Sequence, residues 1–123
     1  AEYLADCRPC GVVEAVYVQA NWAPARHLDE VAFVSQASDE SGFPIAIVAY
    51  ADLLADDVRP QLDALAQNPR VRGVRMQLHW HENTLYRFAS GPDLCRDPRL
   101  QANVARLADY AFSFDLQVFA PQM

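Results

Sequence analysis

The chain has 123 residues, 52% of them hydrophobic, and a formal net charge of −6. This composition predicts a folded core and argues against disorder, so residues 1–123 are expected to form a single segment of one domain. All ten cations are Arg, which excludes Lys-based Schiff-base, phosphate-loop and metal-bridging chemistry from this stretch. Because no three cations are consecutive, a nucleic-acid partner is not expected.

Membrane insertion and disulfide bonding are both disfavoured. The longest apolar stretch, residues 45–51, is far shorter than the roughly 20 residues that span a bilayer, and Ala1 opens no signal segment. We expect no membrane partner and a cytoplasmic location. The odd count of three cysteines, Cys7, Cys10 and Cys95, predicts reduced thiols.

Cys7 and Cys10 have the spacing of a redox Cys-x-x-Cys motif. A redox-active cysteine needs a helix N-terminus to stabilise its thiolate, whereas a strand-like run follows Gly11. Three cysteines are also one ligand short of a closed structural zinc site. The sequence therefore favours neither chemistry here.

Four runs that are apolar on both faces read as buried parallel strands covered by helices. They lie at 12–19, 45–50, 71–77 and 114–119. Between them, apolar positions three and four residues apart predict three helices. Their stripes are Leu28, Val31, Ala32 and Ser35; Val58, Leu62, Leu65 and Ala66; and Leu100, Val104, Leu107 and Ala108.

The residues between these runs agree with helix boundaries. Gly42 with Pro44 ends the first helix, Asn68 with Pro69 ends the second, and Asp97-Pro98 predicts an N-cap followed by proline at the first helical position. Residues 78–96 form a long loop after the third strand, and loops of that length usually carry function or act as a lid.

The alternation predicts an α/β fold of four parallel strands, about half of a (β/α)8 TIM barrel. Strand starts lie 33, 26 and 43 residues apart, close to the roughly 31 per unit of an eightfold barrel of about 250 residues. An open doubly wound sheet would show the same alternation, so the pattern does not choose between them. No Gly-rich turn follows a strand, which argues against nucleotide binding.

Ligands of parallel α/β folds bind at the carboxyl ends of the strands. The strand ends here are polar: Gln19, Asn21, Tyr50, Asp52, Arg75, Gln77, His79, Asp115, Gln117 and Gln122. By the period of two, Arg75 and Gln77 share one strand face. Arg75 is expected to hold an anionic substrate or to pair with Asp52 or Asp115.

The three glutamines at the strand ends have two interpretations. Gln19, Gln77 and Gln117 are expected to bind a polyhydroxy or lactone ligand, or to satisfy one another inside a half-polar core.

His79 and His81 stand two apart on an extended segment, a spacing at which both could face one zinc ion. Such spacing is common by chance, and no further His follows in the chain to complete a site.

Four stretches together resemble a known family: residues 16–22, residues 42–49, the Val-Arg-Gly-Val-Arg-Met-Gln motif at 71–77, and residues 114–118. They are similar, in this order, to the amidohydrolase 2 group of metal-dependent hydrolases. That group includes lactonases acting on sugar lactones and on pyrone dicarboxylate. The resemblance implies that these runs are inner strands of a TIM barrel, the second to the fifth.

The resemblance also changes the reading of the histidines. The family's His-x-His lies at the end of the first barrel strand, before Ala1, so His79 and His81 only mimic it. No metal ligand and no catalytic residue can be transferred to this segment. A divalent metal (zinc) is expected only in the complete protein. What the resemblance implies here is substrate binding by Arg75, Gln19, Gln77 and Gln117.

We therefore expect part of a lactonase-like hydrolase with a small-molecule substrate, inactive as an isolated segment. Exposed barrel edges predict self-association or a homo-oligomer. One alternative is a self-contained, flavodoxin-like α/β domain that binds a small ligand without catalysis. Another is a complete enzyme with zinc at His79 and His81.

Overall fold

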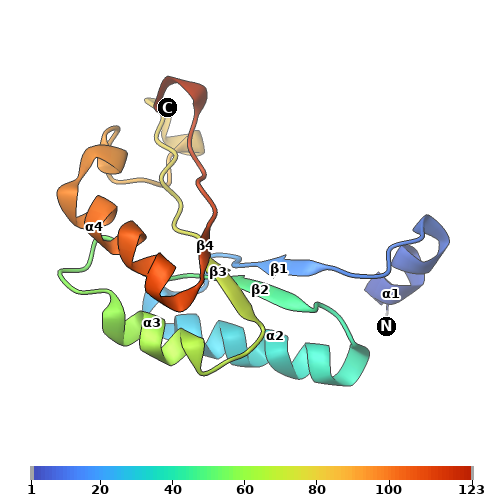
Figure 1. Ribbon diagram of the computed structural model, residues 1–123. Helices are drawn as coiled ribbons and strands as arrows, with labels where there is room; N and C mark the ends of the chain where they lie inside the picture. Colours follow the sequence, from blue (N-terminus) through green and yellow to red (C-terminus); the bar gives the residue numbers. More distant parts are fainter. Residues whose placement is uncertain (1, 123) are drawn as a thin grey trace.

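The computed structural model describes residues 2–122, which contain one four-stranded sheet (Figure 1). Every strand pair is parallel, and the order in space follows the order in sequence, β1-β2-β3-β4. The strands are β1 (Val16–Val18), β2 (Ala46–Ala49), β3 (Val71–Val74) and β4 (Ser113–Phe114). The α-helices are α1 (Glu2–Cys7), α2 (His27–Ser41), α3 (Arg59–Ala66) and α4 (Pro98–Arg106).

The strand order decides between the two predicted architectures. A doubly wound sheet reverses direction at a switch point and carries helices on both faces. Here the order runs without reversal, and α2, α3 and α4 all bury side chains in a single cluster against the sheet. Right-handed crossovers in one direction place every helix on the same face, as in a barrel wall. The described strands therefore do not have the flavodoxin-like arrangement.

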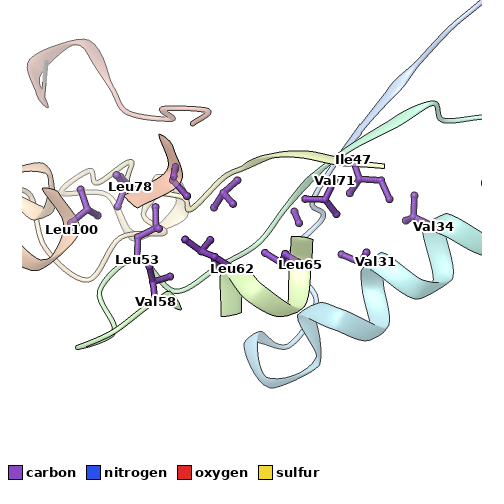
Figure 2. Packing of buried hydrophobic residues seen from close by; sticks show 14 residues of the cluster. Val31, Val34, Ile47, Leu53, Val58, Leu62, Leu65, Val71, Leu78 and Leu100 are labelled. Atoms are coloured by element: carbon purple, nitrogen blue, oxygen red, sulfur yellow. The ribbon is translucent and has the colours of Figure 1, made fainter. Parts of the chain in front are cut away.

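The core lies between this helical layer and the sheet (Figure 2). Its largest fully buried side chains include Ile47 of β2, Leu62 and Leu65 of α3, and Val71 of β3. Burial of each such side chain stabilises the fold by about 1.5–3 kcal/mol. Asn103 is the one polar side chain of α4 buried here, and its amide donates to the carbonyl oxygens of Leu53 (3.1 Å) and Ala55 (2.7 Å), so α4 fixes the loop after β2.

The predicted helix boundaries are largely confirmed. Gly42 ends α2 with a φ of 79°, in the left-handed region that glycine adopts readily. Asp97 caps α4, because its side chain accepts from the Arg99 amide at 2.8 Å. The helix α1 was not predicted; it precedes the first strand and contacts Phe43 through Tyr3.

Several bounds and faces of the predicted elements are wrong. The third and fourth strands end at Val74 and Phe114 rather than at residues 77 and 119. The first strand begins at Val16 rather than at residue 12, and the side chain of Val13 is 80% exposed. Leu28 is 43% exposed, and the buried face of α2 is formed instead by Glu30, Val31, Val34 and Ser38. The β1 edge has no neighbouring strand among residues 2–122, which explains its exposure. Self-association through such edges stays a prediction.

The long loop at residues 78–96 is confirmed. Short helices within it and hydrogen bonds to the C-terminal segment hold it in place. It contains two short 3-10 helices, Thr84–Tyr86 and Leu94–Arg96. The side chain of Gln122 attaches it to the C-terminal segment, donating to Leu78 O (2.9 Å) and accepting from the Trp80 amide (3.0 Å). No helix among residues 2–122 combines the length and apolar composition needed to cross a membrane.

Gly73 of β3 pairs with Ser113 of β4, and the close contact between these two residues can be tested. A Cβ at Gly73 would collide with Ser113 Oγ and lie 3.1 Å from the Ser113 carbonyl oxygen. We predict that Gly73→Ala lowers the free energy of unfolding by about 1–3 kcal/mol, measured by denaturant titration. Gly91→Ala, whose Cβ meets nothing within 4 Å, is the matched control.

Adding Ser113→Ala should recover part of the loss, because it removes the Oγ but not the carbonyl contact. Equal stability of Gly73→Ala and the Gly91→Ala control would contradict this packing.

Candidate functional site

A pocket of about 290 Å³ lies at the carboxyl ends of the first three strands. Polar groups come from the strand ends, with Gln19 and Asn21 after β1, Tyr50 after β2 and Gln77 after β3. The rest of its wall is Trp22, Pro24, Met76 and Phe88. The pocket thus brings together polar residues from the ends of three of the four strands. A small apolar pocket with few polar groups is typical of ligand sites.

The alternation of side chains along the third strand continues past Val74. Met76 and Leu78 belong to the core layer between helices and sheet. Arg75 and Gln77 are therefore on the opposite, helix-free face, together with His79. Backbone pairing also continues, with the Arg75 amide donating to Ala49 O (2.8 Å) and the Leu78 amide to Gln117 O (3.2 Å).

Arg75 does not form the ion pair with Asp52 or Asp115 that one interpretation predicted. Its Nη2 donates instead to the carbonyl oxygen of Gln19 at 2.6 Å, reaching from β3 across to the end of β1. Asp52 is turned toward its own loop, where Oδ1 accepts from the Leu54 amide at 3.0 Å. Within residues 2–122, Arg75 has no carboxylate partner, and its buried Nε has no hydrogen-bond partner. A buried donor left in this way suits an anionic ligand.

The glutamines are placed differently from one another. Gln77 and Gln117 face each other across a parallel bridge that prolongs the β3–β4 pairing. Gln117 Oε1 is buried and has no partner among the described residues. Gln19 is buried, and its Oε1 accepts from the Asn21 amide at 2.9 Å, which shapes the turn where Asn21 adopts a φ of 60°. The three residues thus do not satisfy one another, and substrate binding by them stays a prediction.

Glu30, which was not predicted as a site residue, fixes the position of the β1 end. This carboxylate, on the buried face of α2, accepts from Tyr17 Oη (2.8 Å) and from the Ala20 amide (2.6 Å). Burial, followed by the hydrogen bond to Glu30, raises the pKa of Tyr17 to about 12. The one sequence feature that could have indicated burial of Glu30 is its position in the buried stripe of the helix. Because Glu is ordinarily exposed, that feature alone did not predict burial.

Aromatic contacts hold the walls of the pocket. Trp22 packs on Phe33 of α2 with ring centroids 5.9 Å apart, and the Arg26 guanidinium lies 5.9 Å from the Trp22 ring. Phe88, from the 78–96 loop, packs on His79 at 4.7 Å. Phe88 was not singled out from the sequence, although the loop that carries it was.

His79 and His81 do not fit a zinc ion. The His79 ring is buried between Phe88 and Phe119, and its Nδ1 is enclosed without a partner. Burial, followed by the nearby Arg75 charge, lowers the pKa of His79. His81 Nδ1 already accepts from the Asn83 amide at 2.9 Å. No three His, Cys, Asp or Glu side chains within residues 2–122 are grouped to hold a metal.

The Cys-x-x-Cys motif also lacks the geometry of a redox site. Cys7 is the last residue of α1, whereas a redox-active cysteine lies at the start of an α-helix. Cys7, Cys10 and Cys95 are free thiols.

Comparison with known proteins supports the fold. No family model matches the chain. It is 30% identical over 122 residues to the uncharacterized protein y4mH of Sinorhizobium fredii, covering 99% of this chain and 41% of that protein. It is similar in structure to an amidohydrolase from Burkholderia multivorans that was crystallised with bound zinc, with a TM-score of 0.70 at 23% identity. That match covers 98% of this chain and 39% of the neighbour.

The chain therefore spans about two fifths of the length of both proteins. The structural likeness confirms the predicted fold class, four parallel strands alternating with helices as in part of a TIM-barrel amidohydrolase. This likeness, at 23% identity, extends to the fold alone.

The contact between Tyr17 and Glu30 predicts a measurable titration. Because the folded pKa of about 12 lies above the ordinary value of 10.0, the stability from this contact is fully present below pH 10 and is lost as pH rises toward 12. Between these limits, the wild type should lose more unfolding free energy than Tyr17→Phe. Glu30→Gln should lower the pKa of Tyr17 while burial still keeps it above 10.

The pKa is measured from phenolate absorbance as a difference against Tyr17→Phe. Glu40→Gln, at an exposed position of the same helix, is the control. An unchanged Tyr17 pKa in Glu30→Gln would rule out the contact.

Proposed function

We propose that this chain is the substrate-binding part of an amidohydrolase-type hydrolase that opens a lactone or a related cyclic ester or amide. The observation that carries the proposal is Arg75. Arg75 is not itself among the residues that line the pocket of about 290 Å³, but its guanidinium donates to the carbonyl oxygen of Gln19, which does line it. Arg75 has no carboxylate partner among the described residues, and its buried Nε has no hydrogen-bond partner there. The likeness to the zinc-containing amidohydrolase supports the class of reaction.

In this proposal the residues have separate roles. Arg75 binds a carboxylate on the substrate, because a planar guanidinium and a carboxylate form paired, charge-assisted hydrogen bonds. Gln77 and Gln117 bind hydroxyl or ring oxygens, and Gln19 holds the turn that shapes the pocket. Trp22 and Phe88 supply flat apolar walls for the ring.

The groups that activate water belong, in this proposal, to the rest of a longer protein. Hydrolysis adds water to the lactone carbonyl carbon and breaks the ring C–O bond. A divalent metal such as zinc, or an Asp acting as general base, supplies the activated water in such chemistry. The described residues do not fit the metal, so the part assigned to this chain is binding and orientation.

The activity is tested on the full-length protein with a panel of carboxylated and neutral lactones and cyclic amides, in the presence of Zn²⁺. Opening of the lactones is followed by acid release, and opening of the cyclic amides by chromatographic loss of the starting compound, because the amine formed takes up the released proton. Turnover of a carboxylated lactone is the expected result. Binding of the same compounds without any turnover would favour the alternative of a ligand-binding domain without catalysis, and neither binding nor turnover would refute the proposal.

The role of Arg75 predicts a selective loss. Arg75→Met in the full-length protein should raise the KM for a carboxylated lactone about 10- to 100-fold, because hydrogen bonds to charged groups contribute about 1.5–3 kcal/mol. The KM for the neutral methyl ester of the same lactone should change much less. Arg72→Met, at an exposed position of the same strand, is the matched control.

Steady-state kinetics with the carboxylated lactone and with its methyl ester check this prediction. An equal rise in KM for the acid and the ester would indicate that Arg75 only supports the Gln19 carbonyl.

A further inference from the structure

His79 lies in the segment after β3, on the same helix-free face as Arg75 and Gln77. The proposed binding role does not use this residue. His79 is 7% exposed, and its ring lies between two aromatic rings. The centroid distances are 4.7 Å to Phe88, at an interplanar angle of 40°, and 5.5 Å to Phe119, at 89°. Both distances are in the range of stabilising aromatic pairs.

The backbone of His79 holds the same part of the loop. Its carbonyl oxygen accepts from the amides of Phe88 (3.1 Å) and Ala89 (3.0 Å), so the excursion at residues 80–87 starts and ends at one point. Ala89 is buried at this junction, whereas Phe88 is 57% exposed and lines the strand-end pocket. His79 thus contacts Phe88 through both its backbone and its ring.

Hydrogen bonding by the imidazole does not explain its place in the fold. Nδ1 is buried without a partner among residues 2–122, which is unfavourable for a polar atom. The ring instead contacts Phe88 and Phe119. The planar shape of the side chain, rather than a hydrogen bond, therefore fixes Phe88.

We propose that His79 is a positioning residue that holds Phe88 against the strand-end pocket and thereby sets the affinity for ring-shaped ligands. The inference rests on the proposed function for the identity of the ligand. The position of Phe88 itself is independent of it. Aromatic pairing contributes about 0.5–1.5 kcal/mol, which corresponds to about a twofold to tenfold effect.

The first test needs no substrate. Amide hydrogen exchange is measured in the full-length protein at Phe88 and Ala89. His79→Leu should accelerate exchange at both amides about twofold to tenfold, and His79→Phe, which keeps a flat ring, should exchange like the wild type. His81→Leu is the matched control, because the His81 ring packs on Tyr86 and Phe119 rather than on Phe88.

The second test uses the carboxylated lactone. His79→Leu and Phe88→Ala should each raise KM about twofold to tenfold with little change in kcat, and the double variant should be no worse than Phe88→Ala alone. His79→Phe should restore the wild-type KM. Full additivity of the two substitutions, or a His79→Phe variant as impaired as His79→Leu, would overturn the inference.

The two tests separate the two proposals. If no cyclic ester or amide is bound or opened while exchange responds as expected, the proposed function fails and the positioning of Phe88 stands. If exchange at Phe88 and Ala89 is unchanged in His79→Leu, or changes equally in His81→Leu, the positioning role fails whatever the activity.

Discussion

The candidate site depends on one constraint, the alternation of side chains along the third strand from Val74 to His79. Val74, Met76 and Leu78 are packed in the core on the helical side. The residues between them must then lie on the other face, and a shift of one residue would put Arg75 into the apolar core. Burial of Val74 and Leu78, both 0% exposed, therefore fixes the face on which Arg75 and His79 lie.

That face has the properties of a binding surface rather than of a second core. Three of its buried polar atoms have no hydrogen-bond partner among residues 2–122: Arg75 Nε, His79 Nδ1 and Gln117 Oε1. Each costs about 1–3 kcal/mol, whereas the helical side of the same sheet is closely filled with Leu, Ile and Val. The fourth such atom of the described residues is His27 Nε2, at the start of α2. A fold that places three of four unpaired buried groups at or after the strand ends departs there from the rule that buried polar groups are paired, which is typical of functional sites.

The sequence predicted those features that follow from local chemistry and periodicity. Buried runs gave four parallel strands, Gly42 and Asp97 gave helix ends, and the polar strand ends gave the edge where the pocket lies. It did not predict Glu30 as a buried clamp or Phe88 as a pocket wall, because both depend on contacts between distant segments. The partner of Arg75 was missed for the same reason, since no sequence pattern identifies a backbone carbonyl as an acceptor.

Two exposed residues, one before β1 and one at the start of α2, show what a hydrophobic sequence pattern does not predict. Val13 and Leu28 match a strand and a helical stripe, yet both side chains are exposed, because no element among residues 2–122 covers them. A hydrophobic pattern shows that a surface is suited to burial but does not show what buries it.

The pocket combines a fixed base with walls that come from loops. Strands and the Arg75–Gln19 contact hold the base, whereas Trp22 and Phe88 stand on segments outside the sheet. Both walls are anchored where their loops meet the body, Trp22 by Phe33 of α2 and Phe88 by His79. Because Phe88 is more than half exposed while Ala89 next to it is buried, movement of this wall is expected to pivot at that junction. Ligand affinity then depends on the loop anchors as well as on the polar groups at the strand ends.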